Sequence, residues 1–144
     1  ELRLVGSEMC IRDSYSIVQI LGAISGTLMA NYMFGLDLLQ LSLNTRSGLN
    51  LYISEMIATF GLLLVILRVR TVKLELVAPA VGLYITSAYW FTSSTSFANP
   101  AVTIGRIFTD TFTGIDPNNV LFFLGAQLIG AYIALCVNNF LERN

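Results

Sequence analysis

The chain has 144 residues, of which 55% are hydrophobic and 12% charged, and its net charge is −1. An average soluble domain carries about 25% charged residues, so this composition excludes an ordinary soluble protein, and the small net charge gives no reason to expect a nucleic-acid partner. The sequence contains no histidine, the commonest metal ligand and acid–base group. Cys10 and Cys136 lack metal-ligand spacing. We therefore expect that the protein has no catalytic residue, metal or cofactor and that it is not an enzyme.

Residues 1–14 differ in composition from the rest of the chain. They contain five of its seventeen charges, alternating with apolar residues. The string resembles a translated sequencing adapter, although an ordinary cytoplasmic or interfacial leader would also be rich in charge. We interpret residues 1–14 as a non-native or disordered leader and begin the folded part at residue 15.

Four long stretches of the remaining sequence are almost free of charge. They are residues 14–36, 47–67, 74–105 and 117–141, and the only charges inside them are Glu55 and Glu75. Each is at least as long as the roughly 20 residues that cross a bilayer. They predict an all-α integral membrane protein with spans at about 15–34, 49–67, 76–95 and 119–141. In the first span, Gly22 and Gly26 have the GxxxG spacing that allows another helix to approach closely.

The orientation of these spans is predicted from the basic residues. Arg68, Arg70 and Lys73 form the densest basic cluster, and short loops rich in Lys and Arg lie on the cytoplasmic side. Alternation of the spans then places residues 35–50 and 97–118 outside and the C-terminus in the cytoplasm.

A polar turn follows the third span. Asn99 precedes Pro100, and asparagine at the cap followed by proline at the first position is typical of a helix start. The predicted helix, about 100–112, is too short to span a membrane. On topology alone a surface helix in the outer interface is favoured over a half-helix that re-enters the bilayer, which requires protein around its backbone.

An internal repeat favours the re-entrant alternative. Gln19-Ile20-Leu21-Gly22-Ala23 is similar to Gln127-Leu128-Ile129-Gly130-Ala131, and the two predicted spans run in opposite directions. Similar helices in opposite orientations are typical of an inverted repeat.

The Asn99-Pro100-Ala101 motif, Glu55 and the repeated Gln-x-x-Gly-Ala helices resemble the aquaporin, or major intrinsic protein, family of water and small-solute channels. The resemblance covers residues 15–141. It implies a partial aquaporin-like bundle within 15–144, with four transmembrane helices and the second half-helix, but without the first NPA half. The run from Phe97 to Ile104, followed by 109–115, also resembles a bacterial aquaglyceroporin subgroup found with arsenic-resistance genes.

The resemblance implies roles for individual residues. Asn99 would offer its side-chain amide to permeating water at the membrane midplane. Glu55 would accept hydrogen bonds from the backbone of the re-entrant loop, the alternative being a glutamate near the outer headgroups.

The selectivity filter departs from the family. Val102 stands where the family usually has arginine, and the other filter positions fall at Ser96 and Ser87. These residues predict a wide, less positive filter that admits glycerol or metalloid acids. Arg106, one turn after Val102, is a candidate vestibule charge; the alternative is that it neutralises Asp110 or lies at the outer interface.

The sequence thus predicts a passive channel for water and small neutral solutes. The alternatives are a secondary transporter with inverted repeats, with Glu55 as its coupling residue, and an inactive truncated fragment. Expected partners are the lipid bilayer, small neutral solutes and other copies in a homotetramer, and the expected location is the bacterial inner membrane.

Overall fold

The computed structural model describes the backbone of residues 2–143 and the side chains of residues 10–143. This part of the chain forms helices, turns and loops, with no strand. It divides into two compact units. The α1 unit contains residues up to 44 together with 101–117, and the α2 unit contains 45–100 together with the residues from 118 onward.

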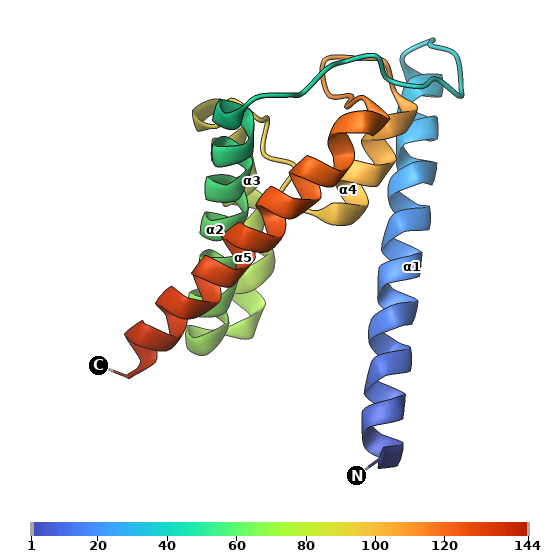
Figure 1. The fold of residues 1–144 in the computed structure, drawn as a ribbon. Helices are drawn as coiled ribbons and strands as arrows, with labels where there is room; N and C mark the ends of the chain where they lie inside the picture. The colour runs from blue at the N-terminus through green and yellow to red at the C-terminus, as the bar shows by residue number, and fades with distance from the viewer. Residues whose placement is uncertain (1, 144) are drawn as a thin grey trace. The chain divides into compact units, whose positions relative to one another are not determined.

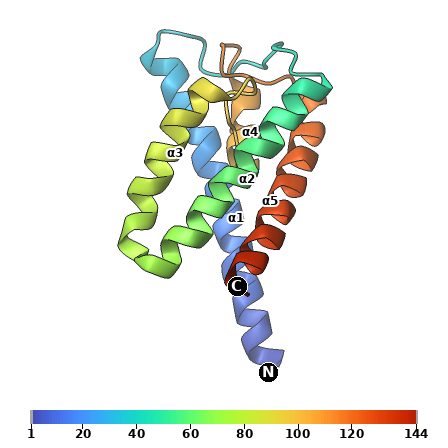
Figure 2. The ribbon, with the colours of Figure 1, turned by 90° about the vertical axis from the view of Figure 1, so that its left-hand side faces the viewer.

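The α2 unit is a bundle of three helices. Helix α2 (Leu49–Val72) packs against both α3 (Val77–Phe91) and α5 (Val120–Glu142), and Figure 2 shows it between them. Short 3₁₀ turns, Leu74–Leu76 and Pro117–Asn119, lead into α3 and α5.

Helices α2 and α5 pack through a stripe of small and buried residues. Gly130 lies directly against the backbone of Met56, whose Cα would be 3.2 Å from an added Cβ. The buried positions of α5 recur every three or four residues, as expected for one face of a helix. They are Val120, Phe123, Ala126, Gln127, Gly130, Ala134 and Asn138.

Helices α2 and α3 are joined by a tyrosine. The Tyr84 hydroxyl donates a hydrogen bond of 2.9 Å to the Ala58 carbonyl, and an added Cβ at Gly61 would meet the Tyr84 ring at 2.9–3.0 Å. Glycine at position 61 therefore makes room for the ring that carries this hydroxyl to its acceptor.

Gly61→Ala should displace Tyr84 and break this bond, at a cost of about 1 kcal/mol in the free energy of unfolding. Tyr84→Phe, which removes only the hydroxyl, is the matched comparison. If the hydroxyl contact is what Gly61 protects, then adding Gly61→Ala to Tyr84→Phe should cost much less than adding it to the wild type.

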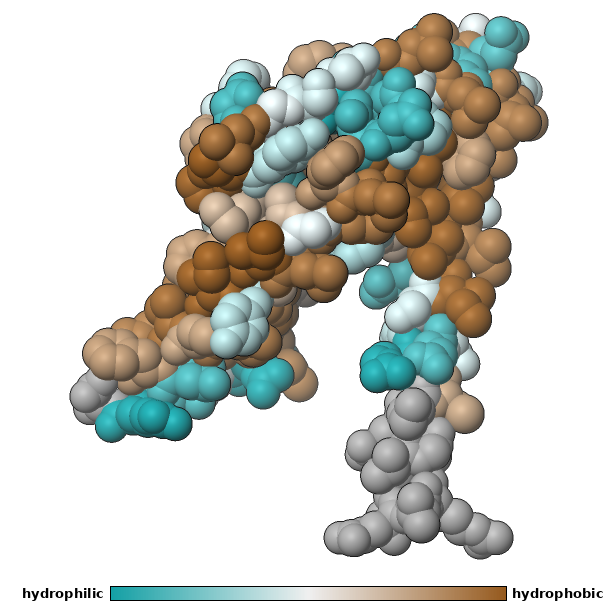
Figure 3. Space-filling model, in the orientation of Figure 1, coloured by the Kyte–Doolittle hydropathy of each residue, from teal (hydrophilic) through white to brown (hydrophobic). Residues whose placement is uncertain are grey.

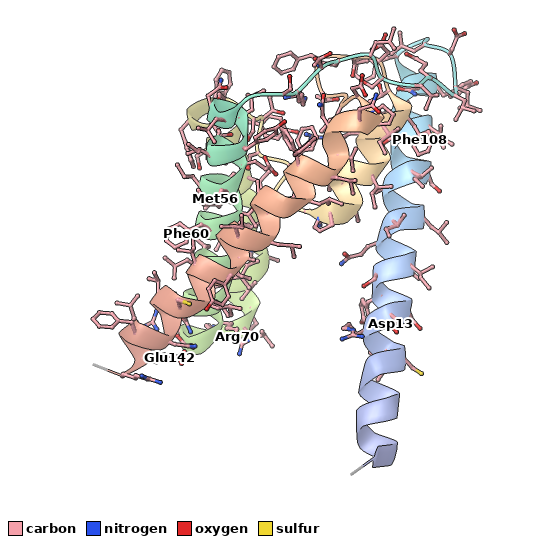
Figure 4. All side chains as sticks on the ribbon, viewed as in Figure 1. Asp13, Met56, Phe60, Arg70, Phe108 and Glu142 are labelled. Atoms are coloured by element: carbon pink, nitrogen blue, oxygen red, sulfur yellow. The ribbon has the colours of Figure 1, made fainter. Side chains whose placement is uncertain are left out.

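Apolar side chains face outward from this unit. Figure 3 shows hydrophobic residues along α5 and hydrophilic residues at its C-terminal end. Leu121, Leu128 and Tyr132 are each more than 65% exposed, so lipid is the natural surrounding for them. Figure 4 shows Arg70 of α2 and Glu142 of α5 at the same end of the unit. That end carries the basic cluster that the sequence predicts to be cytoplasmic.

Three helical segments within residues 2–143 are long and apolar enough to cross a membrane: Leu49–Val72, Leu74–Phe91 and Pro117–Glu142. They correspond to three of the four predicted spans. The first predicted span, 15–34, is helical as far as Met33 but is not among them. The protein is an all-α integral membrane protein.

The α1 unit consists of the long helix α1 (Leu2–Met33), all but the first residue of α4 (Pro100–Gly105), a 3₁₀ turn (Arg106–Phe108) and two loops. Gly105 allows α4 to touch α1, since an added Cβ would lie 2.9 Å from the backbone of Ala23. Figure 4 shows Phe108 beside the C-terminal part of α1.

The start of α1 differs from expectation. Its backbone is helical from Leu2, where the sequence predicts a disordered or non-native leader. That the segment is non-native stays a prediction. The side chains of residues 1–9 lie outside the described part of the chain. Gly22 and Gly26 have nothing within 4 Å of an added Cβ, so no described helix uses their GxxxG spacing.

Two predicted helix ends are wrong. The third span was expected to reach residue 95, but α3 ends at Phe91, where Thr92 turns to extended backbone with φ −108°. The half-helix was expected to reach residue 112, but helical structure ends at Phe108 (Figure 1). The backbone carbonyls of the last turn accept hydrogen bonds from groups outside the helix. The Arg106 carbonyl accepts from Ile115 N–H, and the Ile107 carbonyl accepts from Ser42 N–H. The Phe108 carbonyl accepts from the Asn31 side-chain amide.

Candidate functional site

The segment between α3 and α4, residues 92–99, is the least regular part of the α2 unit. Thr95, Ser96 and Ala98 have φ of 63°, 47° and 46°, a left-handed conformation that is unfavourable for residues with a Cβ. Each such residue costs about 1–3 kcal/mol and persists only where the surroundings enforce it. The segment therefore needs strong external contacts.

Glu55 of α2 supplies the central contacts. Its side chain is fully buried, and its carboxylate accepts hydrogen bonds from Phe97 N–H at 3.2 Å and Ala98 N–H at 2.6 Å. The Gln127 amide of α5 donates to the same carboxylate at 2.8 Å. Since a carboxylate inside a membrane helix is costly without partners, these three donors explain how Glu55 is accommodated. The bonds are of the kind that the resemblance implies, while the role of Glu55 in a pore stays a prediction.

Arg46 supplies a second support that the sequence did not predict. It is 6% exposed, its guanidinium donates to the Ser94 carbonyl at 3.2 Å, and its central carbon lies 5.0 Å from the centre of the Phe97 ring. Its own backbone N–H donates to the Asn119 side chain at 2.9 Å. In a sequence, a lone arginine in a polar loop is typical of a solvated surface. The supporting role of Arg46 is therefore visible only in the folded loop.

The two serines of the predicted filter lie in different environments. Ser96 is buried, and its Oγ, like that of Thr95, has no hydrogen-bond partner among the residues described. Ser87 is exposed on α3, and its hydroxyl donates within its own helix, to the carbonyls of Leu83 and Tyr84. Ser96 thus retains an unused hydroxyl, whereas that of Ser87 is already occupied.

The Asn99-Pro100-Ala101 motif lies at the start of α4. Pro100 is the first residue of the helix, the position where its missing N–H has no cost, and Ala101 is buried. The division between the two compact units falls between Pro100 and Ala101. Asn99 and Ser96 therefore belong to the α2 unit with Glu55, and Val102 and Arg106 to the α1 unit.

Val102 and Arg106 line the same cavity of the α1 unit, which has a volume of about 680 Å³. Val102 belongs to α4, and Arg106 is the first residue of the 3₁₀ turn that follows it. Asp110, the alternative partner for Arg106, accepts a hydrogen bond from Leu43 N–H at 2.9 Å. The role of Arg106 as a vestibule charge stays a prediction.

The described residues offer no metal centre, because no three of their His, Cys, Asp and Glu side chains come together. The polar groups that converge on residues 92–99 in the α2 unit are the Glu55 carboxylate, the Gln127 amide and the Arg46 guanidinium. Such a set can hydrogen-bond a neutral polar molecule.

Comparison with known proteins gives one clear relationship. The chain is 48% identical over 128 residues to "Aquaglyceroporin AqpS" of Rhizobium meliloti (strain 1021), an alignment that covers 89% of this chain and 55% of that protein. The chain thus spans about half the length of the relative. No family model matches the sequence, and no solved structure matches it. Identity of this level over most of the chain, together with the Asn99-Pro100-Ala101 motif, identifies the sequence as one of the aquaporin, or major intrinsic protein, family.

Proposed function

We propose that this chain is part of a passive membrane channel for water and small neutral solutes. One observation carries the proposal. The Asn99-Pro100 turn opens a helix too short to span a membrane, and the backbone leading into it is held by Glu55, a buried carboxylate within a membrane-spanning helix. A half-helix that begins at the depth of the bilayer directs the positive end of its dipole toward the pore.

In this proposal the helix start selects against charge. The N-terminal N–H groups of α4 and the Asn99 amide hydrogen-bond the permeating molecule, and the dipole disfavours cations, protons included. A second half-helix facing Asn99 would come from outside the 144 residues, which is consistent with the chain spanning about half of its relative.

We propose that Val102, Ser96 and Ser87 contribute to the selectivity filter. A valine in place of arginine removes both bulk and charge, and a serine hydroxyl is an uncharged group that can donate and accept hydrogen bonds. These features favour neutral hydroxylated solutes, glycerol or metalloid acids. The relative is named an aquaglyceroporin, in agreement with glycerol.

Val102→Arg tests the filter assignment. In a channel made by fusing residues 15–143 behind the remaining part of the relative, glycerol permeability of proteoliposomes should fall at least about tenfold, a barrier increase of ~1.4 kcal/mol, because the guanidinium narrows the filter. Stopped-flow light scattering measures glycerol and water flux separately, and water flux should fall much less. Val102→Leu is the control for added apolar bulk without charge. Equal glycerol flux in the arginine variant and the wild type would remove Val102 from the filter.

A secondary transporter is the competing function. It would use Glu55 as the titratable coupling group, but the three hydrogen bonds to Glu55 favour a structural role. Solute flux that depends on a proton or sodium gradient would support the transporter. Flux from the 144-residue chain alone, compared with the fusion, tests whether the chain by itself is inactive.

We further propose a bacterial inner-membrane location with the C-terminus in the cytoplasm, and assembly as a homotetramer. The exposed basic residues at the end of α2, Arg68 and Arg70, support this orientation. The protein carries no catalytic group in this proposal and is not an enzyme.

A further inference from the structure

Arg46 is an unusual side chain to find buried in the α2 unit, because arginine is almost never fully buried unless it is paired. The bonds of Glu55 and the Asn99 turn do not explain why a guanidinium is placed there. An apolar side chain of similar size could fill the same space without the cost of removing a charge from water. Stability alone therefore does not account for an arginine at this position.

From its contacts we infer that Arg46 is a positioning residue for the filter, which fixes the backbone of residues 94–97 and thereby the direction of Ser96. The inference rests on the proposed channel function, in which Ser96 belongs to the filter. Arg46 acts on the permeating solute only through the carbonyl of Ser94 and the ring of Phe97.

The two contacts of the guanidinium lie on either side of Ser96 in the sequence. On the N-terminal side, the guanidinium donates a hydrogen bond of 3.2 Å to the Ser94 carbonyl. On the C-terminal side, its central carbon lies 5.0 Å from the centre of the Phe97 ring, which is within the roughly 6 Å of a cation–π contact. A planar guanidinium can donate in its plane and also stack its face on a ring, so one side chain holds both flanks.

The residues between these contacts depend on their neighbours for their conformation. Thr95 and Ser96 have φ of 63° and 47°, which a residue with a Cβ disfavours. Their hydroxyl oxygens have no hydrogen-bond partner among the described residues and so do not hold them. The Ser96 N–H donates to the Ser94 hydroxyl at 3.3 Å, so a shift of Ser94 is transmitted to Ser96.

Glu55 cannot replace Arg46, because the two charges hold backbone groups of opposite polarity. The Glu55 carboxylate accepts hydrogen bonds from two N–H groups that follow Ser96, whereas the Arg46 guanidinium donates to a carbonyl that precedes it. The Ser94 N–H donates to the Ser54 hydroxyl at 3.2 Å. The peptide groups on both sides of Ser94 are therefore held, and Arg46 holds the one that leads to Ser96.

Arg46 is itself fixed by α5. Its backbone N–H donates to the side chain of Asn119 at 2.9 Å, and Asn119 is the N-cap residue of α5. The Phe97 ring packs on Phe123 of the same helix, with the ring centres 5.3 Å apart, and Phe123 is fully buried. The arginine and the ring that it covers are thus both anchored to α5.

The first test measures the conformation of this segment in the 144-residue chain in detergent micelles. Arg46→Met keeps a long side chain but removes the donor and the charge. The backbone carbon NMR shifts of Thr95 and Ser96, which report φ and ψ, should move from left-handed toward extended values. Arg70→Met, at an exposed arginine of α2, should leave them unchanged. Unmoved shifts in Arg46→Met overturn the inference, whether or not the chain belongs to a channel.

The second test measures selectivity in the fused channel described above. The ratio of glycerol to water permeability does not depend on how many channels fold, so a merely structural role of Arg46 would not change it. In Arg46→Met the ratio should fall roughly three- to tenfold, as the loss of about one hydrogen bond to the larger solute implies. Arg46→Lys, which keeps a cation and a donor but not the planar fork, should recover part of the loss.

The outcomes separate this inference from the channel proposal. A glycerol-to-water ratio in Arg46→Met equal to that of the wild type contradicts the positioning role, and so does an Arg46→Lys variant that recovers none of the loss. A wild-type fusion that conducts neither solute rejects the channel proposal instead. In that case the NMR shifts still decide whether Arg46 positions residues 94–97.

Discussion

Glu55→Ala is expected to destabilise the protein by about 3–5 kcal/mol, the range for removing one partner from a buried charged cluster. The substitution leaves Phe97 N–H, Ala98 N–H and the Gln127 amide without their shared acceptor. It also releases a segment with three left-handed residues that depends on these bonds. The free energy of unfolding can be measured by SDS titration in mixed micelles, followed by near-ultraviolet circular dichroism of the packed tyrosines.

Glu55→Gln should have a smaller effect, about 1–3 kcal/mol, because one oxygen still accepts while the new NH₂ group faces a backbone donor. Hydrogen exchange of a peptide covering residues 92–99 should accelerate in both variants. Glu75→Gln is the matched control: its contact with Lys73, at 3.3 Å, joins largely exposed side chains, and such pairs contribute about 0–1 kcal/mol. Equal effects of Glu55→Gln and Glu75→Gln would contradict the bracing role.

Gly130→Val is expected to separate α5 from α2 and to destabilise the protein by about 3 kcal/mol, the upper range for overpacking. A Cβ at position 130 would collide with the carbonyl of Met56, which belongs to rigid helical backbone. The helices can make room only by moving apart, and this would stretch the Gln127 contact with Glu55 in the preceding turn of α5. The same SDS titration measures the loss.

The matched control lies on the same helix. Gly125 has nothing within 4 Å of an added Cβ, so Gly125→Val carries the same change in helix propensity without the collision. It should change stability by less than about 1 kcal/mol. Similar losses in the two variants would mean that propensity, not helix contact, determines the effect at position 130.

The sequence predicted the fold well where one physical property dominates. Stretches of bilayer length that are almost free of charge identified α2, α3 and α5, because solvation by lipid leaves few alternatives to a helix. The end of the helical segment at Phe108, in the 3₁₀ turn after α4, was not predictable in this way. It depends on donors from Ile115 and from Asn31 and Ser42, of which the last two are far away in sequence, and no local pattern contains that information.

The candidate site was predictable to a similar extent. The resemblance to aquaporins implied a bracing role for Glu55, which agrees with the rule that a charge inside an apolar span normally has a partner. Arg46 was missed because its burial arises from the folding of its loop over Ser94 and Phe97.

The way in which residues 92–99 are held has a consequence for how such proteins diverge. The Glu55 carboxylate accepts hydrogen bonds from the backbone N–H groups of Phe97 and Ala98. Every amino acid except proline has a backbone N–H group. The side-chain atoms Thr95 Oγ1 and Ser96 Oγ contribute no hydrogen bond to the described fold. Relatives can therefore differ at positions 95 and 96 while the hydrogen bonds from the backbone to Glu55 stay the same.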